Sequence, residues 1–214
     1  MKKALTAVLM CGMLLAQTKS TAKKAPSTAA ATPAVYRVKM TTSKGVVVIE
    51  VTRDWAPRGA DRFYSLVRSG FFTGAPFFRV VPNFMAQFGI SPKPDVNRTW
   101  EARQLLDDKP TGHSNTRGML TFATTGRPNS RGTQLFINYK DNAFLDPQGF
   151  LPIGQVVEGM EIMDQLYSGY GDTAAKEGDI ESGGQPYLDR YMPKLDKIIS
   201  ATIEPAAPTP AAKQ

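Results

Sequence analysis

Apolar and polar residues alternate with a period of two over much of the chain, which predicts short β-strands. The clearest pair is YRVKMTT at 36–42 and VVVIEV at 46–51, separated by a Ser-Lys-Gly break. Two such runs around a short glycine-containing turn are typical of a β-hairpin. Further strand-like runs lie at 77–89, 119–124, 134–139, 151–157 and 194–203.

Two stretches instead follow a helical period. Within 54–70, Ala56, Ala60, Phe63 and Val67 recur three or four residues apart. A second helix is predicted over 160–167. Many short strands with two isolated helices indicate a β-barrel or a β-sandwich capped by helices.

The two ends of the chain differ from its middle. Residues 1–20 begin with a basic pair and continue with an apolar run at 4–16, as a cleaved signal peptide does. We therefore expect a periplasmic or secreted protein with no membrane span after cleavage; the alternative is a membrane anchor through residues 4–16. Composition predicts a flexible linker at 21–34 and a disordered Pro/Ala tail at 204–214, which leaves a domain at 35–203.

Composition also narrows the chemistry. The lone cysteine, Cys11, lies in the expected signal peptide, and the lone histidine, His113, lies in a polar stretch and is expected to be solvated. Zinc sites and Cys-His catalysis are therefore excluded, and we expect no metal and no cofactor. The net charge of +7 is spread along the chain. It predicts a solvated basic surface with no nucleic-acid partner.

One strand-like segment, FFRVVPNFMAQFG at 77–89, combines a cation, a thioether and an amide among aromatic residues. A cavity built from these groups suits an apolar ring and its adjoining amide. Periodicity alone favours another interpretation, in which Met85 and the phenylalanines are core residues and Arg79 reaches the surface. A single alternation would place these residues on one face, with Pro82 as an interruption: Phe77, Arg79, Val81, Asn83, Met85 and Gln87.

Three ordered blocks resemble the cyclophilin family. Residues 77–89 resemble its signature of an aromatic-basic strand followed by Pro and Phe-Met-x-Gln. GMLTFATTGRPNSRGTQLFI at 118–137 is similar to the second block, and FLDPQGFLPIGQVVEGMEIMDQL at 144–166 to the third. The resemblance spans about 35–203. It implies a mainly β fold, namely a closed eight-stranded antiparallel barrel capped by two α-helices, and isomerisation of the bond preceding proline.

The resemblance also implies roles for individual residues. Arg79 matches the catalytic arginine, and Gln87 matches the glutamine that binds the substrate backbone. Four residues match the positions that form the family's proline-ring pocket: Phe84, Met85, Phe136 and Leu145. Four others match the groove that holds the substrate residues before proline: Ala123, Thr124, Thr125 and Gln134.

This chain departs from the family pattern at three of its positions. Thr124 stands where asparagine is usual, so one side-chain contact to the peptide changes. Phe144 stands where many relatives have tryptophan, and Phe150 where they have a pocket histidine. Because the missing indole donates a hydrogen bond to cyclosporin in the family, we expect weak cyclosporin binding here.

The function implied is that of a monomeric peptidyl-prolyl cis-trans isomerase that assists folding. Its expected partners are proline-containing peptides and unfolded envelope proteins. The alternative is a non-catalytic chaperone or docking module that binds proline peptides. Arg79 favours the enzyme, because binding alone needs no group that acts only in the transition state.

Overall fold

The computed structural model describes residues 31–204. The expected signal peptide, most of the expected linker and the tail beyond Glu204 lie outside this range. Within it, none of the helices combines the length and the apolar character that a membrane crossing requires.

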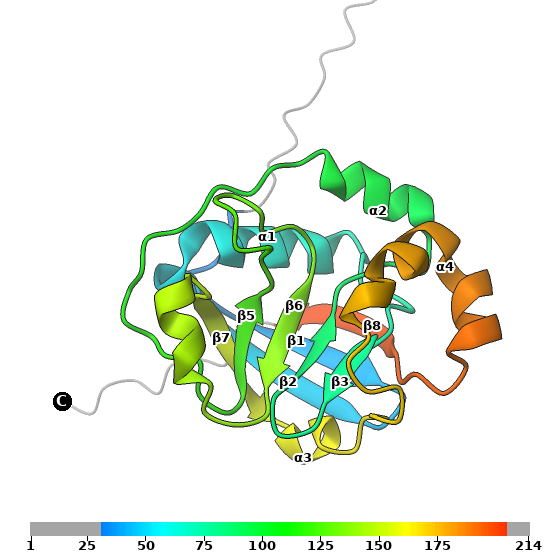
Figure 1. Ribbon diagram of the computed structural model, residues 1–214. Coiled ribbons are helices and arrows are strands. Elements are labelled where there is room, and N and C mark those ends of the chain that lie inside the picture. The colour runs from blue at the N-terminus through cyan, green and yellow to red at the C-terminus, as the bar shows by residue number, and fades with distance from the viewer. Residues whose placement is uncertain (1–30, 205–214) are drawn as a thin grey trace, which may run out of the picture. The chain divides into compact units, whose positions relative to one another are not determined.

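The described chain is built on eight strands that curl around a hydrophobic core (Figure 1). Every neighbouring pair is antiparallel, in the order β3-β4-β6-β5-β7-β2-β1-β8. The bounds are β1 Val35–Thr42, β2 Val46–Thr52, β3 Arg79–Val81, β4 Met85–Phe88, β5 Met119–Phe122, β6 Leu135–Asn138, β7 Pro152–Glu158 and β8 Ile198–Glu204.

The sheet is an open, curled half-barrel, and the expectation of a closed barrel was wrong. β3 and β8 are its edges, and no ladder joins them among residues 31–204. The seam is spanned just before β3 by an isolated bridge between Pro76 and Lys197. Three backbone hydrogen bonds accompany it: Gly74 amide to Ile198 carbonyl at 2.7 Å, Ile198 amide to Ala75 carbonyl at 2.9 Å, and Phe77 amide to Asp196 carbonyl at 2.9 Å. These contacts end before β3, which begins at Arg79, and they do not continue along it as a ladder.

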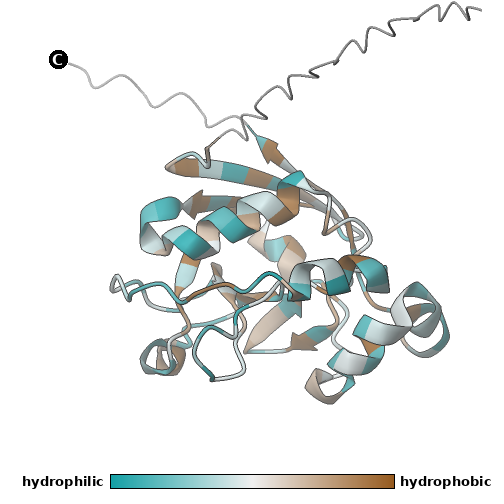
Figure 2. Cartoon of the chain, turned by 90° about the horizontal axis from the view of Figure 1, so that it is seen from above, coloured by the Kyte–Doolittle hydropathy of each residue, from teal (hydrophilic) through white to brown (hydrophobic). Residues whose placement is uncertain are grey.

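The predicted hairpin and the first predicted helix both contribute buried residues to the main core. β1 buries Tyr36, Val38 and Met40 on one face, as the alternation predicted. Helix α1, Pro57–Arg68, packs its apolar side, including Phe63 and Leu66, against the sheet. Figure 2 shows hydrophobic and hydrophilic residues mixed along these elements.

Further helices cover the rim of the sheet. The predicted helix at 160–167 is shorter, α3 at Met160–Met163, and two were not predicted, α2 at Pro94–Glu101 and α4 at Glu177–Tyr191. These two lie side by side at one end of the molecule (Figure 1). Three short 3-10 helices complete the fold: η1 Arg53–Trp55, η2 Ala143–Gln148 and η3 Ala174–Lys176.

The segment 77–89 forms two strands where one alternation was expected. The chain turns between β3 and β4 at Pro82 and Asn83, and Asn83 has a positive φ of 59°. Phe77, which precedes β3, is buried in the main core and does not line the cavity. The hairpin sets Arg79 opposite Gln87 across the ladder, so these two side chains share a face.

The close approach of β7 to β2 generates the first prediction. An added Cβ at Gly154 would lie 2.3 Å from the Glu50 carbonyl oxygen and 2.8 Å from the Val51 Cα. Because both atoms belong to backbone, neither strand can yield cheaply. We expect Gly154→Ala to lower the free energy of unfolding by about 3 kcal/mol, measured by urea denaturation. Gly178→Ala, in a helix with nothing within 4 Å, should leave it unchanged or raise it slightly.

Candidate active site

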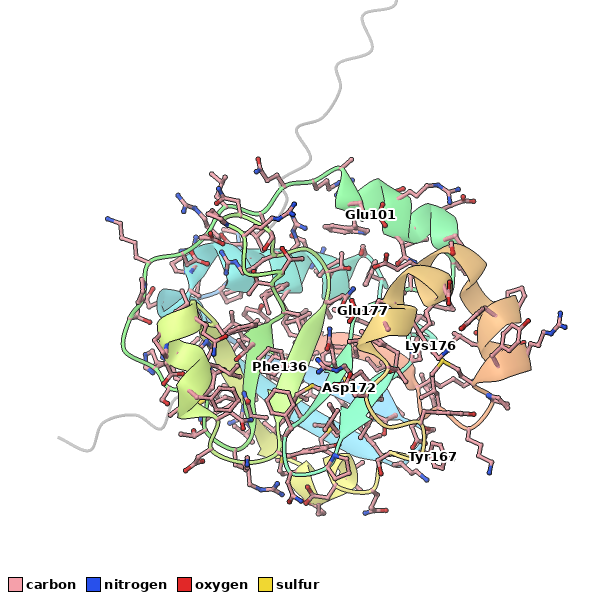
Figure 3. All side chains as sticks on the ribbon, in the orientation of Figure 1. Glu101, Phe136, Tyr167, Asp172, Lys176 and Glu177 are labelled. Atoms are coloured by element: carbon pink, nitrogen blue, oxygen red, sulfur yellow. The ribbon has the colours of Figure 1, made fainter. Side chains whose placement is uncertain are left out.

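A cavity of about 290 Å³ opens on the face formed by β3, β4, β6 and the end of β5. The segment around η2 borders it on one side, and the segment around η3 and α4 borders it on another (Figure 3). Its lining residues are Arg79, Phe84, Met85, Gln87, Glu101, Ala123, Thr124, Thr125, Ser130, Gly132, Thr133, Gln134, Phe136, Leu145, Phe150, Glu177 and Glu181.

A row of hydrogen-bonded polar side chains crosses this cavity. Arg79 Nη1 donates to Gln87 Oε1 at 3.0 Å, and Gln87 Nε2 donates to Gln134 Oε1 at 2.7 Å. Gln134 Nε2 in turn donates to Glu181 Oε1 at 3.2 Å. The strand register begins this row, because Arg79 on β3 pairs with Gln87 on β4. Gln87 in turn pairs with Phe136 on β6, and Gln134 lies two residues before Phe136.

The guanidinium of Arg79 is fixed by a second partner. Its Nε and Nη2 donate to the two carboxylate oxygens of Asp172 at 2.7 and 2.9 Å. These hydrogen bonds hold the pKa of the Asp172 carboxyl below its usual range. The Arg79 side chain is 21% exposed, and its Cζ lies 5.9 Å from the centre of the Phe84 ring. The positive charge therefore sits beside the apolar part of the cavity.

That apolar part is a small cluster separate from the main core. Met85, Phe136 and Leu145 are buried in it, and the partly buried Phe84 and Phe150 pack against them. We call these five residues the ring pocket. Phe136 and Phe150 meet edge to face, with ring centres 5.8 Å apart. Apolar walls of this kind around an open cavity suit an apolar ligand group the size of a ring.

Buried asparagines fix the η2 side of the ring pocket. Asn115 Nδ2 donates to Asp146 Oδ1 and to the Phe150 carbonyl, both at 2.8 Å. Asn142 Nδ2 donates to the Phe84 carbonyl at 2.9 Å. Both asparagines are fully buried. Removing either asparagine would leave its buried polar partners without a hydrogen bond. These contacts therefore hold η2, which carries Leu145, to the sheet.

The groove beyond β5 is organised by backbone and hydroxyl contacts. The Ala123 amide donates to the Gln134 carbonyl at 3.0 Å, which continues the β5–β6 pairing past the end of the strands. Thr124 Oγ1 lies 2.6 Å from Ser130 Oγ, and the same Ser130 oxygen accepts from the Thr125 amide at 3.2 Å. The Thr124 hydroxyl is therefore engaged within the loop.

Eleven of the twelve site residues that the resemblance implied line this one cavity. Phe144 is the exception. Its side chain is 56% exposed and stacks on Phe84, with ring centres 6.0 Å apart. Phe144 therefore supports the outer side of the ring pocket and does not line the cavity. His113 also lies away from the cavity, half-buried and stacked on Trp55.

Sequence reasoning missed the acidic side of the site. Asp172 contacts Arg79, and Glu101, Glu177 and Glu181 line the cavity. Figure 3 labels Asp172 and Glu177, which belong to the segment around η3 and the start of α4, and Phe136 on β6. Burial raises the pKa of the Glu181 carboxyl, and its bond from Gln134 opposes this. The four-residue spacing of Glu177 and Glu181, typical of one helix face, was the available signal.

Comparisons with known proteins give the family. The model described as "Cyclophilin type peptidyl-prolyl cis-trans isomerase/CLD" matches residues 37–183. The chain therefore belongs to the cyclophilin-type peptidyl-prolyl cis-trans isomerase family. Its enzyme class is that of a peptidyl-prolyl cis-trans isomerase.

Individual relatives agree with this assignment. A "Peptidyl-prolyl cis-trans isomerase" of Acinetobacter baylyi is 36% identical over 133 residues, covering 60% of this chain and 70% of the relative. "Peptidyl-prolyl cis-trans isomerase B" of Escherichia coli is 32% identical over 167 residues, covering 75% and 94%. A cyclophilin crystal structure from Cryptosporidium parvum shares the fold, with a TM-score of 0.60 and 21% identity over 81% of this chain and 99% of that chain.

The ion pair in the site generates a pH prediction. Asp172 ionises more readily in the folded chain than in the unfolded chain, because Arg79 binds its charged form. Its stabilising contribution is therefore present above the unfolded-state pKa and is lost as the pH falls through the folded-state pKa. We expect a carboxyl ¹³C NMR titration of Asp172 to give a midpoint below the usual aspartate range. Arg79→Ala should raise this midpoint; an unchanged midpoint would contradict the pairing.

Proposed function

We propose that this chain isomerises Xaa-Pro bonds of unfolded or exported proteins and so assists their folding. The observation that carries the proposal is the fixed guanidinium of Arg79 beside an apolar pocket that is separate from the core. Export rests on the signal-like pattern of residues 1–20. We further propose that the protein acts as a monomer.

The reaction has a barrier that geometry can lower without proton transfer. Resonance keeps the prolyl peptide bond planar, and rotation costs about 18–20 kcal/mol. Uncatalysed exchange takes roughly 10–100 s, which is slow enough to limit folding. As the bond twists, the proline nitrogen becomes pyramidal and regains its lone pair. A donor aimed at this nitrogen stabilises the twisted state alone and therefore accelerates the reaction.

Arg79 is suited to supply this donor. A guanidinium stays charged at any pH the protein meets and presents rigid N–H groups. The two contacts with Gln87 and Asp172 orient it before substrate arrives. Preorganised donors of this kind act without reorganisation during the reaction. Pure binding would not require such a group, which favours turnover over a chaperone or docking role.

The remaining lining residues would hold the peptide around the twisting bond. The ring pocket would keep the proline ring still and exclude water from it, while Gln87 would bind the substrate backbone. Residues before the proline would lie along Ala123, Thr124, Thr125 and Gln134. Because Phe144 is exposed and carries no donor, we propose weak cyclosporin binding as well.

Replacing the arginine tests the mechanism. We expect Arg79→Ala to lower kcat/KM by about 10² to 10³ on a proline tetrapeptide in a protease-coupled assay, because one preorganised donor is lost. Arg79→Lys should recover little, since an ammonium lacks the planar fork. Binding of the peptide should persist in both variants.

A matched control is available in Arg53, which makes the same two-bond pair with Asp61, at 2.7 and 2.9 Å, and does not line the cavity. Arg53→Ala should keep full activity. If Arg79→Ala kept near-full activity, Arg79 would not be the catalytic group. Wild-type peptide binding without turnover would establish the chaperone alternative instead.

Truncating the pocket tests the binding part of the proposal. Phe84→Ala should raise KM by about tenfold, because an apolar contact with the proline ring is lost, with a smaller effect on kcat. Steady-state kinetics on peptides of the same sequence would measure the two constants. Tyr191→Ala, which removes another exposed aromatic ring outside the cavity, serves as the control and should change neither.

A further inference from the structure

Asp172 lies between α3 and η3, outside the three sequence blocks, yet it makes two of the three hydrogen bonds to the Arg79 side chain. We propose that Asp172 is a positioning residue, whose carboxylate fixes the plane in which Arg79 presents its donors to the substrate. The inference rests on the catalytic role proposed for Arg79. It adds a residue from a distant segment to the machinery of the reaction.

The contacts with Asp172 and Gln87 orient the Arg79 guanidinium but leave some of its N–H donors free of partners among the described residues. A guanidinium has five N–H groups: one on Nε and two on each terminal nitrogen. Asp172 takes the Nε hydrogen and one on Nη2, and Gln87 takes one on Nη1. The bonds among the described residues thus leave one donor on Nη1 and one on Nη2. Two fixed donors therefore remain for the twisting bond and its neighbouring carbonyl.

Asp172 is itself held in place, which distinguishes this ion pair from an ordinary surface pair. The Ala174 amide donates to Asp172 Oδ1 at 3.1 Å. Thr173, which is 3% exposed, donates its hydroxyl hydrogen bond to the Phe78 carbonyl. Phe78 directly precedes Arg79, so a buried contact ties the carboxylate to the strand that carries its partner. Exposed pairs without such support contribute little, because both side chains must be ordered.

The orientation imposed on Arg79 extends to both glutamines. Because Arg79 donates to Gln87, the Gln87 oxygen must face the arginine and its NH₂ group must face Gln134. The Gln134 oxygen then accepts, and its NH₂ group points to Glu181. The donor directions of the whole polar row therefore follow from the placement of one guanidinium. Loosening Asp172 would disturb groups that it does not touch.

The test compares Asp172→Ala and Asp172→Asn with wild type. Misplaced catalytic groups lose rate more than affinity, so we expect Asp172→Ala to lower kcat by about tenfold with KM changed by less than about twofold. Asp172→Asn keeps one acceptor oxygen and should fall between. In the Arg79→Ala background, Asp172→Ala should cause no further loss, because the two residues act as one unit. Asp61→Ala, which breaks the equivalent pair outside the cavity, should keep wild-type kcat.

A second measurement does not depend on activity. The ¹⁵N–¹H signal of the Arg79 Nε–H group should exchange slowly in wild type, quickly in Asp172→Ala and at an intermediate rate in Asp172→Asn. An unchanged kcat in Asp172→Ala, an equal loss in the Arg79→Ala background, or an equal loss in Asp61→Ala would overturn the proposal. So would fast exchange of this signal in wild type. A wild-type chain that lacks isomerase activity but shows the protected signal would refute the proposed function without refuting the ion pair between Arg79 and Asp172. If Asp172→Ala does not fold, the kcat of Asp172→Asn and the exchange of the Arg79 Nε–H signal test the positioning role.

Discussion

The pairing of β4 with β6 is the constraint on which the site depends. It places Gln87 beside Phe136, so a polar row and an apolar pocket meet along one line of the sheet. On the other side of β4, the hairpin to β3 adds Arg79 to the same line. A slip of one residue would turn these side chains toward the opposite face and bury the polar row in the core. Backbone register therefore sets the chemistry more firmly than any single side-chain contact does.

Local patterns predicted the parts of the fold that local interactions decide. The hairpin of β1 and β2 and the buried side of α1 follow directly from periods of two and 3.6 residues. Helix α4 was missed because Gly184, with non-helical backbone angles, and Pro186 interrupt its period. The closed barrel failed as an expectation because the contacts between the segment before β3 and β8 stop at an isolated bridge, a long-range feature that no local pattern reports.

The candidate site also contains residues that the sequence predicted and residues that it did not. Arg79, Gln87 and the ring pocket lie in motifs, so resemblance located them, whereas periodicity alone favoured a core role for Met85. Asp172 was not predictable, since 93 residues separate it from Arg79 and an isolated aspartate carries no pattern. Glu177 and Glu181 could be predicted to line the cavity only if the side of α4 that faces the sheet were known. Long-range polar contacts of this kind depend on the assembled fold, and no window of sequence contains them.

The open seam leaves strand edges exposed, and the edge nearest the cavity is the one formed by β3. A free strand edge is a template on which another chain can add a strand, and such additions lead to aggregation. Here the β3 edge is only three residues long, and Pro82 follows it at once. A segment bound at this edge would find too few backbone groups to extend the sheet there. The β3 edge, which borders the cavity, therefore offers little backbone for irreversible strand exchange.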